Sequence, residues 1–206
     1  MSEIQTLDDS PEKPQVVIVK NCFSPTELDL IWKEIDVLQP MLLNASETKS
    51  ALRDDGYLKK KNKGAFLNEI YGNENPYEKS NIIKAFTKLY SYDMVNTLMN
   101  HYTHFNLLTR PINISALLSY YGNGDYYESH KDYSNLTILG YFFREPKSFT
   151  GGDFILNDWN ISIPIENNMV IYMPSHYSHE VSKVVMEEDN PGFGRYCISQ
   201  FLTAAN

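Results

Sequence analysis

The sequence predicts an α+β fold in which N-terminal helices pack on one sheet of a C-terminal jelly roll. Up to residue 110, the apolar residues recur at helical spacing in two zones. From Pro111 onward, they form eight short runs separated by turn residues, a pattern typical of a sandwich or barrel. Eight strands fit a jelly roll, and helices that precede the strands along the chain are expected to cover one of its sheets.

The N-terminal half begins with a polar, acidic segment, residues 1–14, which we expect to be a disordered tail. Residues 15–20 form a short apolar run of strand character. The segment 24–27, Ser-Pro-Thr-Glu, combines a capping box with a proline at the first helical position, so a helix is predicted to begin here. A second helical zone spans residues 81–101. The apolar faces of the two zones consist of Leu28, Leu30, Ile31, Ile35 and Leu38, and of Ile83, Phe86, Leu89, Tyr90, Met94 and Leu98.

Between these zones, residues 41–80 are polar, contain Gly and Asn, and show no period. Long irregular stretches in compact domains are often lids or binding loops, so we expect this one to order over a substrate. Within it, residues 59–63 read Lys-Lys-Lys-Asn-Lys. This basic run is interpreted as a solvated loop, with contact to an acidic substrate segment as the alternative.

The eight strands of the jelly roll are predicted from the apolar runs and the turn residues that bound them. Their ranges are 112–121, 127–132, 136–143, 153–156, 161–165, 169–173, 180–185 and 195–202. We therefore expect one domain over residues 15–206, with a helical and loop half at 15–110 and a jelly-roll core at 111–206.

Composition narrows the possible partners and compartment. A formal net charge of −8 argues against general binding to nucleic acids or anionic membranes, which requires a basic face. No apolar run approaches the ~18 residues of a transmembrane helix, and the N-terminus lacks the apolar core of a signal peptide. Two cysteines, Cys22 and Cys197, do not form a disulfide framework. We expect a cytoplasmic protein with neither nucleic-acid nor membrane partners.

Three residues have the pattern of a metal site. His130 and Asp132 are two residues apart in a predicted strand, so their side chains are expected on the same face. A histidine from a neighbouring strand completes a 2-His-1-carboxylate triad, which leaves coordination positions open on non-heme Fe(II). His179 begins a predicted strand and is the preferred third ligand, while His176 is the alternative.

The segments around these residues carry a family resemblance. Residues 120–132 read Tyr-Tyr-Gly-Asn-Gly-Asp-Tyr-Tyr-Glu-Ser-His-Lys-Asp, and residues 195–199 read Arg-Tyr-Cys-Ile-Ser. Together with Gly151-Gly152 and the His-Glu-Val at 179–181, they resemble the 2-oxoglutarate- and Fe(II)-dependent dioxygenases, in particular the prolyl 4-hydroxylase branch. The resemblance covers residues 112–203 well and the N-terminal half only loosely.

The resemblance implies a double-stranded β-helix, the jelly roll of this family, as a single dioxygenase domain. It also implies Fe(II) held by His130, Asp132 and His179, with 2-oxoglutarate and O₂ as cosubstrates and no catalytic residue beyond the metal site. Three further roles follow from it. In the last of them, Phe142 could face inward in place of Tyr141. Arg195 would hold the distal carboxylate of 2-oxoglutarate, Tyr120 and Tyr127 would line the cosubstrate pocket, and Tyr141 would donate to the same carboxylate.

The resemblance also bears on the reaction and the substrate. It implies decarboxylation of 2-oxoglutarate to succinate, coupled to hydroxylation of an unactivated C–H bond. Proline within a peptide or protein is the preferred substrate, a free amino acid or other small molecule is the second choice, and a non-catalytic jelly-roll binding module is the third. Phe201 stands where the oxygen-sensing enzymes carry Trp, and also where nucleic-acid demethylases carry a second Arg.

Overall fold

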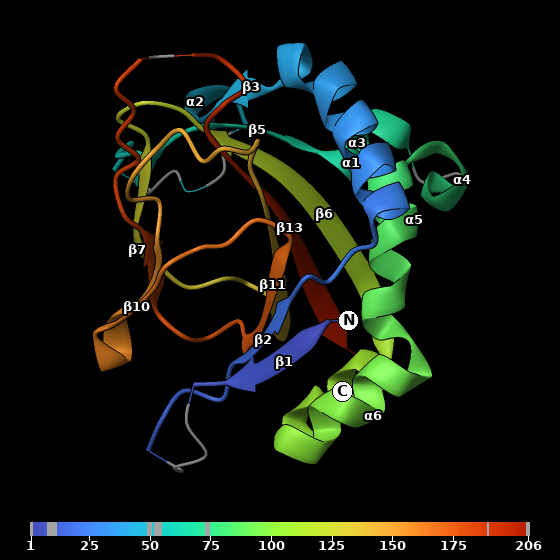
Figure 1. The fold of residues 1–206 in the computed structure, drawn as a ribbon. Coiled ribbons are helices and arrows are strands. Elements are labelled where there is room, and N and C mark those ends of the chain that lie inside the picture. The colour runs from blue at the N-terminus through green and yellow to red at the C-terminus, as the bar shows by residue number, and fades with distance from the viewer. Residues whose placement is uncertain are drawn as a thin grey trace.

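The computed structural model describes residues 2–7, 12–48, 51, 55–72, 75–188 and 190–204. Two antiparallel sheets face each other, and most of the helices cover the outer face of the larger sheet (Figure 1). The α-helices are α1 (Pro25–Leu38), α2 (Ala45–Thr48), α3 (Leu67–Tyr71), α4 (Pro76–Lys79), α5 (Asn81–Phe86) and α6 (Tyr92–His101). The 3-10 helices are η1 (Gln39–Met41), η2 (Thr87–Tyr90), η3 (Thr103–Thr109) and η4 (Asn157–Trp159).

The larger sheet has the strand order β1-β2-β11-β8-β13-β6-β5-β3, and the smaller sheet has the order β10-β9-β12-β7-β4. The strands of the larger sheet are β1 (Glu3–Thr6), β2 (Val17–Lys20), β3 (Leu43–Asn44), β5 (Lys63–Phe66), β6 (Pro111–Tyr121), β8 (Leu136–Phe142), β11 (Met169–Pro174) and β13 (Arg195–Ala204). The strands of the smaller sheet are β4 (Lys60–Lys61), β7 (Tyr126–His130), β9 (Phe154–Leu156), β10 (Ile161–Ile163) and β12 (His179–Val181). The eight strands predicted for the C-terminal half and the α+β jelly-roll class are confirmed.

The larger sheet is buried on both faces, and its central strand β13 shows how the two faces differ. Tyr196 and Ile198 point into the apolar core beneath the helices. Arg195 and Cys197 point the opposite way, toward the smaller sheet. Successive side chains alternate between the faces of a strand, so one continuous buried strand serves both the helix-facing core and the space between the sheets.

Helix α1 begins as its sequence predicts. Ser24 Oγ accepts a hydrogen bond from the Glu27 N–H, and a Glu27 carboxylate oxygen accepts one from the Ser24 N–H, which completes the capping box. The predicted face packs on the sheet through Ile31 and Ile35, both fully buried. Buried Glu34 accepts hydrogen bonds from Ser80 Oγ and from the N–H of Ile82, and thereby ties α1 to the start of α5.

The expectation of one long irregular loop at 41–80 is wrong for most of its length. Two short helices and three strands form within it and α4 lies near its end, while residues 49, 50, 52–54, 73 and 74 lie outside the described residues. Strand β5 extends the larger sheet beside β6, and β4 extends the smaller sheet beside β7. Strands of two to four residues carry no readable period, because their stability comes from the partner strand that tertiary structure supplies.

The N-terminal segment also differs from its prediction as a disordered tail. Glu3–Thr6 form β1, which pairs antiparallel with β2, while Met1 and residues 8–11 lie outside the described residues. Backbone hydrogen bonds to the exposed edge of a sheet need no apolar pattern in the added strand, so composition did not reveal this pairing.

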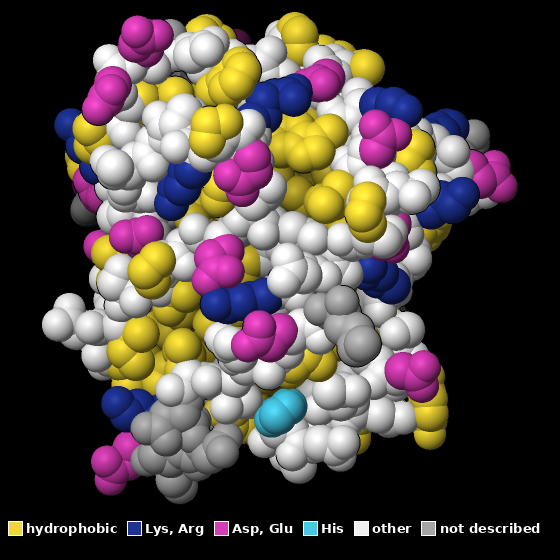
Figure 2. Space-filling view, viewed as in Figure 1, with side chains coloured by type: hydrophobic (Ala, Val, Ile, Leu, Met, Phe, Trp, Pro, Cys, Tyr) yellow, Lys and Arg dark blue, Asp and Glu magenta, His cyan; other side chains and the backbone are white. Residues whose placement is uncertain are grey.

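The surface and the helices give two further observations. On the face shown in Figure 2, acidic and basic side chains are interspersed. Within the described part of the chain, none of the helices has the length and apolar character needed to cross a membrane.

Half-buried His104, in η3, makes stability depend on pH. Burial, followed by the influence of His176, lowers its pKa to about 4, and its Nε2 has no hydrogen-bond partner among the described residues. Between this value and the unfolded pKa of 6.5, the unfolded state binds more protons, so stability falls as pH drops below 6.5. We compare the free energy of unfolding of the wild type with that of His104→Gln. We expect the difference in favour of the wild type to decrease from pH 7.5 to pH 5, by less than about 1.4 kcal/mol per pH unit. Urea denaturation of both proteins measures this difference, and parallel pH profiles would contradict it.

Candidate active site

A cavity lies between the two sheets and encloses about 620 Å³ of atom-free space, its open mouth included. Its wall on the larger sheet consists of Phe66, Leu117, Ser119, Tyr121, Leu139, Tyr141, Arg195, Cys197, Ser199 and Phe201. Its wall on the smaller sheet and the adjoining turn consists of Lys60, Tyr127, His130, Asp132, Phe154, His179 and Val181.

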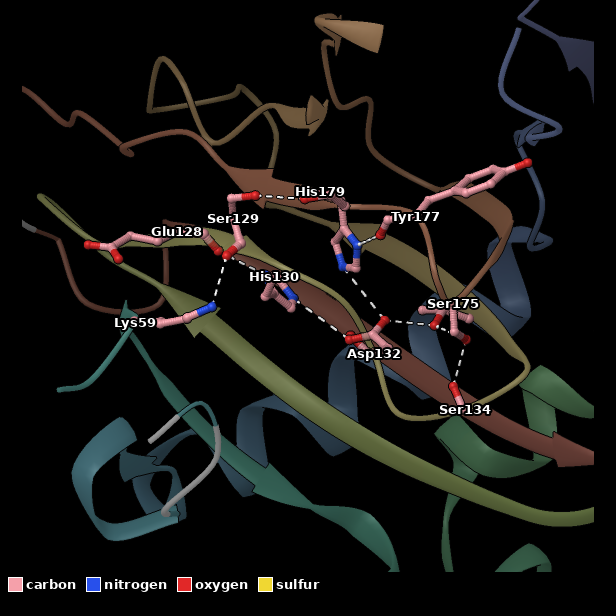
Figure 3. Close-up of polar contacts among 12 residues, drawn as sticks. Lys59, Glu128, Ser129, His130, Asp132, Ser134, Ser175, Tyr177 and His179 are labelled. Atoms are coloured by element: carbon pink, nitrogen blue, oxygen red, sulfur yellow. Dashed lines mark hydrogen bonds and ion pairs between the residues drawn. The ribbon is translucent and has the colours of Figure 1, made fainter. Parts of the chain in front are cut away.

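His130, Asp132 and His179 come together in this cavity (Figure 3). His130 ends β7 and His179 begins β12, and the two residues are direct partners across these antiparallel strands. The Nε2 atoms of His130 and His179 lie 3.7 and 3.6 Å from the carboxylate oxygens of Asp132. One potential ligand atom from each residue lies within 4.8 Å of the other two, so the three side chains could hold one metal ion.

Asp132 does not extend the strand as predicted, because β7 ends at His130. Its backbone N–H instead donates to the carbonyl oxygen of Ser175, in the turn after β11. Its side chain still faces the cavity beside the two imidazoles. His130 and Asp132 therefore face the same cavity, as expected, but the turn after β7 brings this about and not the alternation of a strand.

Hydrogen bonds orient both imidazole rings. The Nδ1 atoms of His130 and His179 each lie 2.9 Å from a backbone carbonyl oxygen, of Glu128 and Tyr177 respectively. A carbonyl can only accept, so Nδ1 carries the proton in each ring and Nε2 presents its lone pair to Asp132. Metal-bound histidines in proteins show this arrangement, and both rings are thus prepared for ligation.

The charges of the site also suit a cation. Burial, followed by the neighbouring His179, lowers the pKa of His130 to about 2, so its ring is neutral at physiological pH. Burial likewise raises the pKa of Asp132, although His179 and the hydrogen bond from Thr137 oppose the shift. A divalent cation would offset the cost of keeping this carboxylate ionised in the cavity. Neutral imidazoles and an ionised carboxylate are the forms that bind metal.

A chain of hydroxyl groups supports Asp132. Thr137 Oγ1 donates to Asp132 Oδ2 at 2.7 Å and lies 2.8 Å from Ser175 Oγ, which in turn lies 2.6 Å from Ser134 Oγ. Thr137 and Ser175 are fully buried. The predicted strand 136–143 contains Thr137, but the sequence alone contains no signal that it supports the carboxylate.

Thr137→Val is expected to weaken Fe(II) binding by about 10–100-fold, because it removes the hydroxyl that orients Asp132 and preserves the shape of the side chain. Titration of the metal-free protein with Fe(II) under anaerobic conditions measures this change. Ser134→Ala is the matched control, since Ser134 reaches Asp132 only through Ser175 and Thr137. Equal affinities of Thr137→Val and the wild type would contradict the role assigned to Thr137.

Arg195 lies at the start of β13 and is 1% exposed. Its guanidinium carbon lies 4.8 and 4.9 Å from the ring centres of Tyr121 and Tyr141. Its Nε and Nη1, and the hydroxyl of Tyr141, have no hydrogen-bond partner among the described residues. Buried donors without acceptors are costly, so this part of the cavity is suited to a carboxylate that accepts from both residues. Gly152 allows the close approach of its backbone, because a Cβ there would lie 3.0 Å from Arg195 Cδ.

Of the three tyrosines predicted for the site, two line the cavity and one does not. Tyr127 lines the cavity, and its ring is stacked on His130 at 3.5 Å between ring centres. Tyr141 also lines the cavity, whereas Phe142 points into the helix-facing core. The prediction for Tyr120 is wrong: its ring packs on Tyr196 beneath the helices, and its hydroxyl accepts from the N–H groups of Gly192 and Gly194.

Among the side chains of the cavity wall that sequence reasoning missed, Tyr121 and Lys60 carry polar groups that bear on the function. The neighbour of Tyr120, Tyr121, is the tyrosine of β6 that faces the cavity, and two adjacent tyrosines gave no indication of which one points inward. Lys60 also lines the cavity, although its basic run was interpreted as a solvated loop. The alternative third ligand, His176, is exposed in the turn after β11 and does not belong to the cluster of potential ligands.

Comparisons with known proteins agree with this geometry. The model of the 2OG-Fe(II) oxygenase superfamily matches residues 116–203. An uncharacterized PKHD-type hydroxylase of Synechocystis is 27% identical over 108 residues, which are 43% of this chain and 36% of that protein. The chain thus matches about a third of the length of this curated relative.

Two solved structures share the fold over most of their length. A prolyl-4-hydroxylase of Pseudomonas putida has a TM-score of 0.59 at 13% identity, with 94% of this chain and 95% of that chain covered. A 2OG-Fe(II) oxygenase family oxidoreductase of Burkholderia pseudomallei has a TM-score of 0.57 at 13% identity, with 93% and 86% covered. The jelly-roll core, residues 116–203, is thus similar in sequence to the 2OG-Fe(II) oxygenase superfamily, and the chain shares the fold of a prolyl-4-hydroxylase.

Proposed function

We propose that this protein is a 2-oxoglutarate- and Fe(II)-dependent oxygenase that hydroxylates an unactivated C–H bond, with proline in a peptide or protein as the preferred substrate. One observation carries the proposal. A single cavity contains both a cluster of two histidines and an aspartate, and a buried arginine whose Nε and Nη1 have no acceptor among the described residues. Metal and dicarboxylate thus each find matching groups in the same enclosed space.

The residues present fit the cofactor of the family. His130, Asp132 and His179 would hold Fe(II), since their free ligand atoms converge and their outer hydrogen bonds are in place. Arg195 and Tyr141 would hold the distal carboxylate of 2-oxoglutarate through the donors that have no partner among the described residues. When bound, Fe(II) with 2-oxoglutarate and O₂ supplies the conversion of C–H to C–OH, with release of succinate and CO₂.

Other residues of the cavity wall exclude water and hold neighbouring side chains in place. Leu139, Phe154 and Val181 are apolar and line the space between the sheets, so they exclude water from it. Ring stacking holds Tyr127 against His130. A dry cavity favours coupling of cosubstrate breakdown to substrate oxidation, because it limits side reactions with water. Asp132 supplies a carboxylate at the ligand position that is missing in the related halogenases. Its presence favours hydroxylation over halogenation.

The preference for a prolyl substrate is supported by the segment 120–132, which resembles the prolyl hydroxylases. Proline-rich chains are already extended and lose little entropy on binding. Residues 41–80 supply edge strands to both sheets and add Lys60 and Phe66 to the cavity wall, so this part of the chain takes part in substrate choice. A free amino acid remains the second candidate.

Succinate formation from 2-oxoglutarate, with and without Fe(II), tests the enzymatic function. The substrate is tested with proline-containing peptides beside free L-proline, scored by a mass gain of one oxygen atom. We expect oxygen in the peptides and none in the same peptides incubated with Asp132→Ala. Incorporation into free amino acids alone would favour the small-molecule alternative, and no 2-oxoglutarate turnover or binding would favour a non-catalytic jelly-roll module.

A further inference from the structure

Lys60 is a buried cation in the wall of the candidate active site. It is 4% exposed and lines the cavity from β4, the edge strand of the smaller sheet. It lies directly opposite Tyr127 in the sheet, and its Nζ lies 5.3 Å from the centre of that ring. No hydrogen bond or ion pair joins its ammonium group to any residue that the structure describes.

The neighbouring lysines of the basic run have different surroundings. Lys59 Nζ donates to the carbonyl oxygen of Ser129, on the strand beside it (Figure 3). Lys61 Nζ pairs with Asp125 Oδ1 at 3.3 Å and is well exposed. The interpretation of this run as a solvated loop is therefore wrong for Lys60, whose side chain the pairing of β4 with β7 directs inward.

An ammonium with no anionic partner among the described residues requires an explanation in such a place, because burial of a charge without an opposite charge is costly. Burial lowers the pKa of Lys60 to about 8, and the charge of Asp132 opposes that shift. Asp132 is already engaged by Thr137 and by the proposed metal. An anion from outside the protein would supply the missing partner.

The cosubstrate does not require this cation under the proposed function, on which the present inference rests. Arg195 and Tyr141 would receive the distal carboxylate of 2-oxoglutarate, and its keto-acid end would lie at the metal. Lys60 belongs to a transverse row of the smaller sheet with Tyr127, Val181 and Phe154, separate from Arg195 on the larger sheet. The cavity therefore contains one cationic side chain, Lys60, that is needed neither to hold the metal nor to bind the cosubstrate.

We propose that Lys60 binds a carboxylate of the molecule that is hydroxylated. The substrate would then carry an acidic group on or beside the oxidised residue. Two sources share this chemistry: an Asp or Glu next to proline in a peptide, and the α-carboxylate of a free amino acid. Charge-assisted hydrogen bonds are stronger than neutral ones, so the site should distinguish an acid from its amide.

Matched acid and amide pairs test this proposal without turnover. The probes are L-proline with L-prolinamide, and end-blocked peptides containing Asp-Pro with the same peptides containing Asn-Pro. Binding to the Fe(II)- and 2-oxoglutarate-loaded protein is measured anaerobically by calorimetry. The wild type should bind the acid of at least one pair about tenfold more tightly or better, and the pair that does so identifies the source of the carboxylate. Lys60→Gln should bind acid and amide equally, and Lys60→Arg should retain part of the preference.

Lys61→Gln is the control, since it removes a neighbouring charge outside the cavity, and it should keep the preference for acids. If Lys60→Gln does not fold, Lys60→Met, which keeps the aliphatic stem, takes its place. Equal binding of acids and amides by the wild type would overturn the proposal, as would a preference that survives the change. A tenfold loss of 2-oxoglutarate affinity in Lys60→Gln with the preference intact would assign Lys60 to the cosubstrate instead. Failure of the wild type to bind 2-oxoglutarate would contradict the proposed function separately.

Discussion

Asp132→Ala is expected to abolish Fe(II)-dependent turnover and to weaken Fe(II) binding by well over the roughly 10–100-fold that changes outside the ligand sphere produce. Facial coordination has three protein ligands and no spare, so loss of any one leaves the metal with too few. His130→Ala and His179→Ala should have the same effect. Anaerobic Fe(II) titration, together with succinate release in the presence of 2-oxoglutarate, measures both consequences.

His176→Ala is the matched control for these ligand changes, because His176 is the exposed histidine closest in sequence to His179. It should retain Fe(II) affinity and turnover. The assignment of the third ligand would be wrong if His176→Ala lost the metal and His179→Ala kept it. Circular dichroism of each metal-free variant separates loss of the ligand from loss of the fold.

Arg195→Met should weaken 2-oxoglutarate binding by roughly 30-fold or more while Fe(II) affinity changes little. Removing one partner of a buried, hydrogen-bonded charge pair costs about 2–5 kcal/mol, and 1.4 kcal/mol corresponds to about a factor of ten. Methionine retains the length of the side chain, so the wall formed with Tyr121 and Tyr141 stays filled. The KM for 2-oxoglutarate and its dissociation constant from the Fe(II) protein are the measurements.

Arg144→Met provides the control for the loss of an arginine. Arg144 packs over Trp32, pairs with Asp36 and is partly exposed, outside the cavity wall. It should leave the affinity for 2-oxoglutarate unchanged. An unchanged 2-oxoglutarate constant in Arg195→Met would remove Arg195 from the proposed site, and a parallel loss of Fe(II) affinity would indicate a general disruption of the cavity.

The sequence by itself determined the strands of the jelly roll, the start of α1 and the order of the chemical groups. These features depend on local information: apolar runs bounded by turn residues, the capping box at Ser24, and His130-x-Asp132 followed by His179 and Arg195. These predictions stay valid even where the predicted end of a helix or strand differs from the observed one by a few residues. Asp132 is predicted inside the strand 127–132; it lies beyond the end of β7 and still faces the same cavity as His130.

Only the tertiary structure decided which side chains line the cavity. The larger sheet is buried on both faces, so Tyr120 and Tyr121 both fit the pattern of β6, and a shift of one residue exchanges their faces. Strand β4 has two residues and exists because β7 offers it an edge, so no period in the sequence could have placed Lys60 inside. Side-chain direction in short or doubly buried strands depends on pairing between distant segments, and the chain folds these together only in three dimensions.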